Sequence, residues 1–340
     1  MEKCLVTKLK GAVDNQELLR IGEIGLDVDI STPAALELIT NAKCTLRIIG
    51  DGYFTNESNG NLGTSFQVPA STESVIYVSA GKYKITISDK YDFNSVRFSK
   101  KGTSDYNLNP SVDIDSFKYS KNITALNIGN KVYGDMSALK DLKNITFLSI
   151  NSPSVVGDIS TLQDMNKLNS LYLIGCSGIV GDIAALKGKN ISFIDLSKTT
   201  INGDIANLSS CTSLHHINAS GVFTGDISVF KNASNLNYVT LSKSNLTGDL
   251  AKLPNTCICF SSLGSFIWSE RTSSAKIITL DKYATIDNVD KMLQDQAKCE
   301  VPASSPFLKI ISATGTRTPA SDAAVQTLQS KGYTVSINPA

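Results

Sequence analysis

The chain has two histidines, His215 and His216, and they are adjacent on one expected strand. Side chains alternate between the two faces of a strand, so the two rings cannot act as a catalytic pair. From the register of Ile217 we expect His216 to face the outer side of the sheet and His215 to face the interior. The sequence has no glycine-rich phosphate loop, no His-Glu-x-x-His motif and no nucleophile elbow. These features predict a protein that is not an enzyme.

Aspartate follows glycine at six regularly spaced positions, and each step leads into an aliphatic residue. A ladder of carboxylates can bind calcium, but calcium-binding β-rolls use Gly-Gly-x-Gly-x-Asp, a pattern that this sequence lacks. An aspartate before a short helical segment also caps it by accepting an amide hydrogen bond. We therefore expect capping aspartates, no bound metal and no cofactor. The six glycines are Gly134, Gly157, Gly181, Gly203, Gly225 and Gly248.

The seven cysteines are an odd number and lack the spacing of a disulfide framework. We expect reduced thiols, several of them small apolar residues of the core. Cys257 and Cys259 could form half of a metal site, but no second pair of ligands lies nearby in the sequence. The paired carboxylates Asp113 and Asp115 have a spacing that is common at strand edges.

The Gly-Asp steps recur at intervals of 23, 24, 22, 22 and 23 residues. Upstream of them, aliphatic residues are spaced three and then two apart, as in Ile191, Ile194 and Leu196. This spacing predicts a short strand with alternate residues inside, and the glycine permits a tight turn after it. One coil buries about six aliphatic side chains, worth roughly 10–15 kcal/mol. Ordering its residues costs more, at about 1–2 kcal/mol each, so the coils must stack on one another.

The segment Leu241-Ser-Lys-Ser-Asn-Leu246-Thr-Gly248-Asp249-Leu250 resembles the plant-type leucine-rich repeat, whose convex side carries a Leu-x-Gly-x-Ile element. The proline that usually follows this element is absent here. The resemblance covers residues 123–250 and implies a leucine-rich-repeat α/β solenoid with a parallel β-sheet. It also implies that partners bind the concave side of that sheet.

Residues that flank the inward aliphatics project from the predicted concave sheet. Aromatic side chains among them would form a ladder at the strand spacing of about 4.8 Å. Water disfavours such a stripe, so it suggests a docking site for a partner protein or a glycan, unless a neighbouring subunit covers it. The predicted binding residues are Phe147, Tyr172, Phe193, Asp195, His216, Asn218 and Tyr238.

The flanks differ from the repeats. Short β-like runs separated by turn-rich spacers predict a β-sandwich-like domain over residues 29–119, which would also cap the N-terminal edge of the solenoid. The solenoid would occupy residues 120–265. Residues 266–340 predict strands at 277–280, 307–311 and 333–337 with helices at 286–298 and 321–330 between them. This βαβαβ order predicts an α/β cap that continues the parallel sheet.

Residues 1–28 fit neither neighbouring pattern and predict an anchoring arm, with Cys4, Leu5, Val6 and Leu9 as its apolar contacts. The segment Met1-Glu-Lys-Cys-Leu-Val-Thr-Lys-Leu-Lys-Gly11 resembles the start of virion and tail-associated proteins of Bacteroides phages, including the crAss-like group. Ile21-Gly-Glu-Ile-Gly25 adds to this likeness. The resemblance implies a docking segment that joins different display domains to a phage particle.

The overall charge and hydropathy limit the partners. The formal net charge is +1, so no global positive field attracts nucleic acid, and no apolar run is long enough to cross a membrane. The N-terminus also lacks a secretory h-region, which favours assembly in a host cytoplasm. We expect a phage head (capsid) fibre or decoration protein, a dimer or trimer bound to capsid or tail proteins, with a host surface protein or glycan as possible ligand. A bacterial cell-surface adhesin and a cytoplasmic scaffold are the alternatives.

Overall fold

A computed structural model describes residues 112–118, 123–128, 132–303 and 309–339 of the chain. Before residue 112 it describes only the backbone of the strands β1 to β11. The chain forms two compact units. Unit 1 comprises Met1–Leu168 with Gly175–Gly178, and unit 2 comprises Asn169–Ile174 with Ile179–Ala340. None of the described helices is both long and apolar enough to cross a membrane.

The N-terminal strands of unit 1 pair mainly antiparallel. One sheet has the order β3-β10-β5-β8, and β11, β4, β9, β6 and β7 pair in a second group. Because their side chains lie outside the described residues, the β-sandwich stays a prediction, as do the domain boundaries. Leu5, Val6 and Leu9 of the predicted arm also lie outside the described residues. The strands are β1 (Lys3–Cys4), β2 (Leu19–Arg20), β3 (Glu23–Ile30), β4 (Ala34–Thr40), β5 (Cys44–Gly50), β6 (Phe54–Asn56), β7 (Gly60–Asn61), β8 (Ser65–Val68), β9 (Glu73–Val78), β10 (Gly81–Ser88) and β11 (Ser95–Lys100).

The repeats form coils, and one coil of unit 2 shows their construction. The strand β19 (Phe193–Leu196) leads through a loop to β20 (Gly203–Asp204) and then to the 3-10 helix η6 (Ile205–Leu208). Every aliphatic residue that points inward from this coil is at most 1% exposed. The strands of successive coils pair in parallel, as β19 does with β21. The predicted leucine-rich-repeat solenoid with a parallel sheet is therefore confirmed.

The same order of elements recurs in both units. In unit 1, β11 pairs in parallel with β13, so the coils begin beside an N-terminal strand. The first strands are β13 (Ala125–Ile128), β15 (Phe147–Ile150), β17 (Ser170–Leu173), β21 (His216–Ala219), β23 (Tyr238–Asp249) and β24 (Cys259–Ile267). The second strands are β12 (Val112–Asp113), β14 (Val132–Asp135), β16 (Val155–Asp158), β18 (Gly178–Val180) and β22 (Phe223–Asp226). The 3-10 helices are η2 (Ile114–Phe117), η3 (Met136–Leu139), η4 (Ile159–Leu162), η5 (Ile183–Leu186), η7 (Ile227–Asn232) and η8 (Leu250–Lys252).

The Gly-Asp steps have the capping role that the sequence predicts. In all six, the aspartate side chain accepts a hydrogen bond from the amide two residues later, at the start of a 3-10 helix. Four of these aspartates pair in parallel with the residue that stands two before the next aspartate, as Asp204 does with Thr224; the others are Asp135, Asp182 and Asp226. This stagger brings the next glycine over the carboxylate. A Cβ added to Gly225 would lie 2.5 Å from Oδ1 of Asp204, and its φ is +116°. Glycine is therefore required by both conformation and space.

One coil begins earlier than the sequence pattern indicates. Asp113 accepts a hydrogen bond from the amide of Asp115 and caps η2, in the same way as the later aspartates. Val112 stands where those coils have glycine, so a search for Gly-Asp passes over this step. In the pair Asp113 and Asp115, Asp113 is thus the cap of η2, and Asp115 donates the amide that it accepts.

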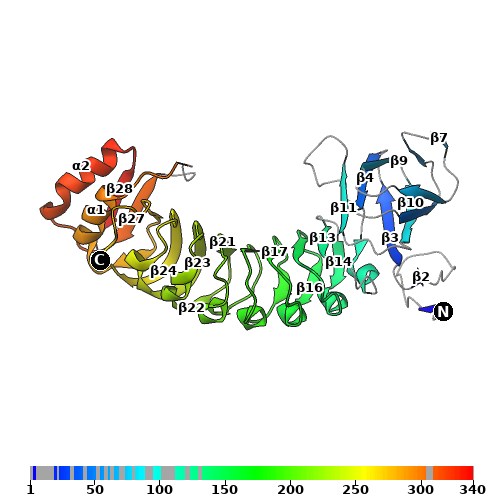
Figure 1. Cartoon of the computed structure of the whole chain (residues 1–340), viewed down its shortest axis with the longest axis horizontal. Helices are drawn as coiled ribbons and strands as arrows, with labels where there is room; N and C mark the ends of the chain where they lie inside the picture. The colour runs from blue at the N-terminus through cyan, green and yellow to red at the C-terminus, as the bar shows by residue number, and fades with distance from the viewer. Residues whose placement is uncertain are drawn as a thin grey trace. The chain divides into compact units, whose positions relative to one another are not determined.

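The C-terminal part of unit 2 continues the parallel sheet, as predicted. Helices α1 and α2 lie beside β27 and β28 (Figure 1). The strand predicted at 277–280 is shorter, because the amide of Ile277 donates to Glu300 and that of Ile278 donates to the side chain of Gln296. The elements are β25 (Thr279–Leu280), β26 (Ala284–Ile286), α1 (Val289–Lys298), β27 (Ile310–Thr314), η9 (Pro319–Ser321), α2 (Asp322–Ser330) and β28 (Thr334–Asn338).

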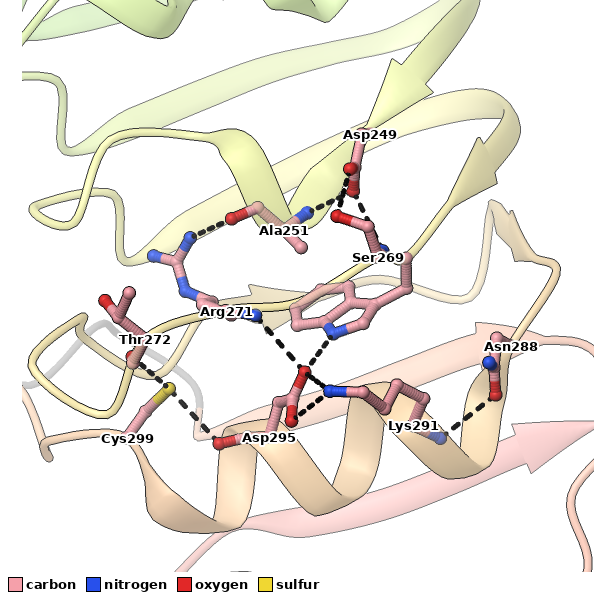
Figure 2. A network of polar contacts seen from close by, with 10 residues as sticks. Asp249, Ala251, Ser269, Arg271, Thr272, Asn288, Lys291, Asp295 and Cys299 are labelled. Atoms are coloured by element: carbon pink, nitrogen blue, oxygen red, sulfur yellow. Dashed lines mark hydrogen bonds and ion pairs between the residues drawn. The ribbon is translucent and has the colours of Figure 1, made fainter.

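A buried polar network joins the last regular coil to α1 (Figure 2). The guanidinium of Arg271, a residue only 4% exposed, donates to the carbonyls of Ala251, Leu253, Pro254 and Lys276. Its backbone amide and the indole N–H of Trp268 both donate to Asp295 on α1. Burial opposes ionisation of Asp295, but these bonds and the ammonium of Lys291 hold the pKa of its carboxyl below the usual value. The network satisfies the carbonyls at the end of η8.

Candidate binding surface on the first strands

The outward side chains of the first strands in unit 2 form a surface that we call the strand face. Inward residues such as Ile194 and Leu196 alternate with them along each strand. The parallel pairing places the outward residues in two columns. The first column contains Ser170, Phe193, His216, Tyr238 and Cys259, and it ends at Thr279, which is buried. The second contains Tyr172, Asp195, Asn218, Thr240 and Ser261. Asp281, the residue after β25, extends the second column through a side-chain hydrogen bond with Ser261.

The structure brings six of the seven predicted binding residues together on the strand face. Phe193 is 37% exposed, and the other five are half-buried. Phe147 belongs to unit 1, where it is half-buried and pairs across the sheet with Ala125. Whether any of these residues binds a ligand stays a prediction.

Aromatic rings contact one another across neighbouring strands. The rings of Phe193 and His215 stack with centroids 5.3 Å apart and planes inclined by 5°. Those of His216 and Tyr238 are tilted, with centroids 5.6 Å apart. The prediction that His215 faces the interior is wrong, because it is half-exposed and Leu214 takes the interior position. The strand begins only at His216, so strict alternation does not extend back to His215.

Burial sets the ionisation of two side chains on the strand face. It lowers the pKa of His216, although the carboxylate of Asp195 acts in the opposite direction, so the imidazole is neutral at pH 7. Burial also raises the pKa of Tyr172, and Asp195 adds to that effect. At neutral pH the aromatic residues therefore form a surface without positive charge.

Hydrogen bonds from two residues hold the carboxylate of Asp195 in place. Its Oδ1 accepts the amide of Ser197 at 2.9 Å, and the amide group of Asn218 lies 3.4 Å from both carboxylate oxygens. This geometry fixes the carboxylate beside the aromatic column. It leaves Oδ2 with only one long hydrogen bond among the described residues.

Sequence reasoning missed the continuation of both columns beyond Tyr238. In the next coil, Cys257, Phe260 and Ser262 occupy the positions that earlier coils fill with aliphatic residues. Because serine and cysteine replace two of the inward aliphatic residues there, the aliphatic spacing of three and then two residues cannot be recognised in the sequence. The aromatic Phe260 between them was the one signal available. The added surface contains Ser261 and Asp281, whose oxygens share a short hydrogen bond.

The two cysteines of this coil have different surroundings. Cys257 is buried, which raises the pKa of its thiol to about 12, and its Sγ donates to the carbonyl of Cys259. Cys259 lies half-buried in the first column. Among the described residues, no group of three or more His, Cys, Asp or Glu side chains has a geometry that could hold a metal ion.

Comparison with known proteins gives similarities of structure alone. The sequence matches no protein-family profile and no curated protein. The structure is similar to an internalin (inlF) from Listeria monocytogenes, with 15% identity over 67% of this chain and 72% of that chain and a TM-score of 0.44. It is similar to the leucine-rich-repeat ectodomain of the Arabidopsis receptor kinase HAESA, with 16% identity over 66% of this chain and a TM-score of 0.47. This chain spans 40% of that ectodomain. For a plant ice-binding protein the identity is 13% over 56% of this chain and 79% of that chain, with a TM-score of 0.38. These values identify no ligand or partner for this chain.

Proposed function

We propose that this chain is a non-enzymatic recognition protein that binds its partner through the strand face. The observation that carries the proposal is the pair of columns in unit 2, where partly exposed aromatic rings lie beside hydrogen-bonding side chains at the spacing of the strands. Partly exposed rings next to fixed polar groups are typical of surfaces that bind other molecules. The stacked coils support this surface, because the aliphatic residues directly beneath it are fully buried.

We further propose that the protein is a structural component of a phage virion, a head fibre or decoration protein. Its N-terminal arm would bind capsid or tail proteins, and the coils would face outward toward a host protein or glycan. The likeness of residues 1–11 to phage virion proteins supports this role. A bacterial cell-surface adhesin is the alternative, and it shares the same recognition surface.

Electron microscopy tests the location of the protein. Particles purified from a lysate are labelled with an antibody against this chain, and membrane fractions of the same cells are labelled in parallel. A virion protein gives label on the particles, on either head or tail. Label confined to cell surfaces would establish the adhesin instead.

A deletion tests the anchoring arm. Removing residues 1–22 spares β3, which begins at Glu23 and pairs with β10. We expect the shortened protein to fold, as judged by circular dichroism, and to be lost from particles. Normal incorporation of the shortened protein would contradict an anchoring role for these residues.

A further inference from the structure

The strand face carries only negative formal charge. Among the described positions of its two columns in unit 2, Asp195 and Asp281 are the charged residues, and neither column contains a lysine or arginine. Lys198 and Lys282 lie in the loops that follow β19 and β25, Lys243 lies at the register shift within β23, and all three are exposed to solvent. His216 adds no positive charge at neutral pH, because burial lowers its pKa.

Neither carboxylate is neutralised within the part of the chain that the structure describes. The partners of Asp195 are the amide of Ser197 and the side-chain amide of Asn218. Those of Asp281 are the hydroxyl of Ser261 and the amide of Tyr283. Burial raises the pKa of Asp281, although these hydrogen bonds oppose the effect, so its charge is held in an unfavourable environment. A cation beside it would relieve that cost.

The spacing of the two carboxylates gives the length of the ligand. Four strand steps separate them in the second column, which is roughly 19 Å at about 4.8 Å per step. An extended peptide advances about 3.3–3.6 Å per residue, so it covers this distance in about six residues. Asn218, Thr240 and Ser261 lie between the carboxylates and offer hydrogen bonds to a peptide backbone. The rings of His216 and Tyr238 lie alongside.

We propose that the strand face binds an extended peptide segment with two basic residues about six positions apart, one reaching Asp195 and the other Asp281. This inference rests on the proposed recognition function and specifies its ligand. Opposite charge is the reason to prefer a basic peptide over a neutral glycan, since a glycan would leave both carboxylates without a counter-charge. The aromatic column contributes contact area and cation–π attraction for the basic side chains.

The test uses a fluorescent peptide of ten residues with arginines at positions 2 and 8 in a Ser/Gly background. Its binding to the full chain is measured by anisotropy. Two comparison peptides have both arginines replaced by glutamine or placed next to each other. We expect the spaced peptide to bind more tightly than either, and its affinity to fall when salt rises from about 0.05 M to about 0.5 M.

The variants Asp195→Asn and Asp281→Asn remove the charges while an amide oxygen can still accept the same hydrogen bonds. Each should weaken binding of the spaced peptide about fivefold to tenfold. Glu270→Gln is the matched control, because Glu270 is an exposed acid of the same unit outside both columns. It should leave binding unchanged, and thermal unfolding should be the same for all three variants.

The outcomes separate this inference from the recognition function. Equal binding of the glutamine peptide, no salt dependence, or full binding by both aspartate variants would overturn the basic-peptide ligand. If Tyr238→Ala then abolishes binding of a neutral oligosaccharide, the strand face still recognises a partner, and only the ligand class is wrong. If substitutions on the strand face affect no bound molecule, the recognition function itself fails.

Discussion

The regular coils of unit 2 and its C-terminal end satisfy the polar backbone groups of their 3-10 helices in different ways. In the coils, each 3-10 helix is capped by the aspartate before it, which lies under the glycine of the next coil, as in Asp204 and Gly225. After Asp249 the pattern stops. Trp268 stands at the position of the next glycine, and the amide and hydroxyl of Ser269 donate to the carboxylate of Asp249. Arg271 then satisfies the carbonyls at the end of η8 from within the core.

The difference shows what repetition contributes. A capping aspartate acts over two residues, so it can recur in every coil and is visible in the sequence. Arg271 acts once, and apart from Lys276 its partners are residues 17 to 24 positions away, so nothing repeats to reveal it. The regular repeat ends here, and the described elements that follow, including α1, have no capping aspartate of the same kind, so a different set of hydrogen bonds joins them to the last coil.

The largest effect is expected for Arg271→Met. It would remove the guanidinium donor from the buried carbonyls of Ala251 and Leu253, whereas the carbonyl of Pro254 would keep the amide of Cys257 as a donor. We expect a loss of about 3–5 kcal/mol in the free energy of unfolding, measured by urea denaturation. Arg317→Met is the control, since Arg317 forms a partly exposed ion pair with Asp322 and should cost less than about 1 kcal/mol. Equal losses in the two variants would mean that the C-terminal end needs no buried donor.

A glycine in the coils gives the next largest effect. A Cβ added to Gly221 would lie 1.5 Å from the carbonyl oxygen of Ile201, so the backbones of two coils must separate. We expect Gly221→Ala to destabilise the protein by about 3 kcal/mol. Gly188→Ala is the matched control, because Gly188 has φ +80° but open space around its Cα. It should cost about 1–2 kcal/mol, the conformational term alone. A larger loss for Gly188→Ala would show that backbone conformation, and not the approach of the coils, limits stability.

A single cap should matter less. Asp204→Ala removes the acceptor for the amide of Ala206, and we expect a loss of about 1 kcal/mol. Asp204→Asn keeps a side-chain oxygen and should lie within a few tenths of a kcal/mol of the parent chain. Thermal unfolding of both variants measures the difference. A large loss in the asparagine variant would indicate that the charge has a role beyond capping.

On the strand face we expect a small effect on stability and a larger one on binding. Phe193→Ala should cost less than about 1.5 kcal/mol, because its ring is 37% exposed. Phe230→Ala, which empties a position only 1% exposed, should cost about 3–5 kcal/mol. Phe193→Ala and Tyr238→Ala should nevertheless weaken binding of the arginine peptide. If Phe193→Ala unfolds the protein as readily as Phe230→Ala, its ring belongs to the core.

Much of the solenoid could be predicted because its signals are local and repeated. The spacing of Ile191, Ile194 and Leu196 indicates the strand and its inward face, and the Gly-Asp step indicates the turn and cap. The same register assigned Phe193 and Asp195 correctly to the strand face. It assigned His215 wrongly, because periodicity does not specify the residue at which a strand begins.

By itself, the sequence determined the coil, its period, the capping aspartates and which residues alternate on each strand. These depend on hydrogen bonds over two to four residues and on burial that repeats in every coil. Only the tertiary structure decided that Asp281 joins Asp195 in one column, that Arg271 is buried, and that an aspartate such as Asp204 lies beneath the glycine of the next coil. Those contacts join residues about 20 or more positions apart, and their geometry depends on how neighbouring coils are staggered.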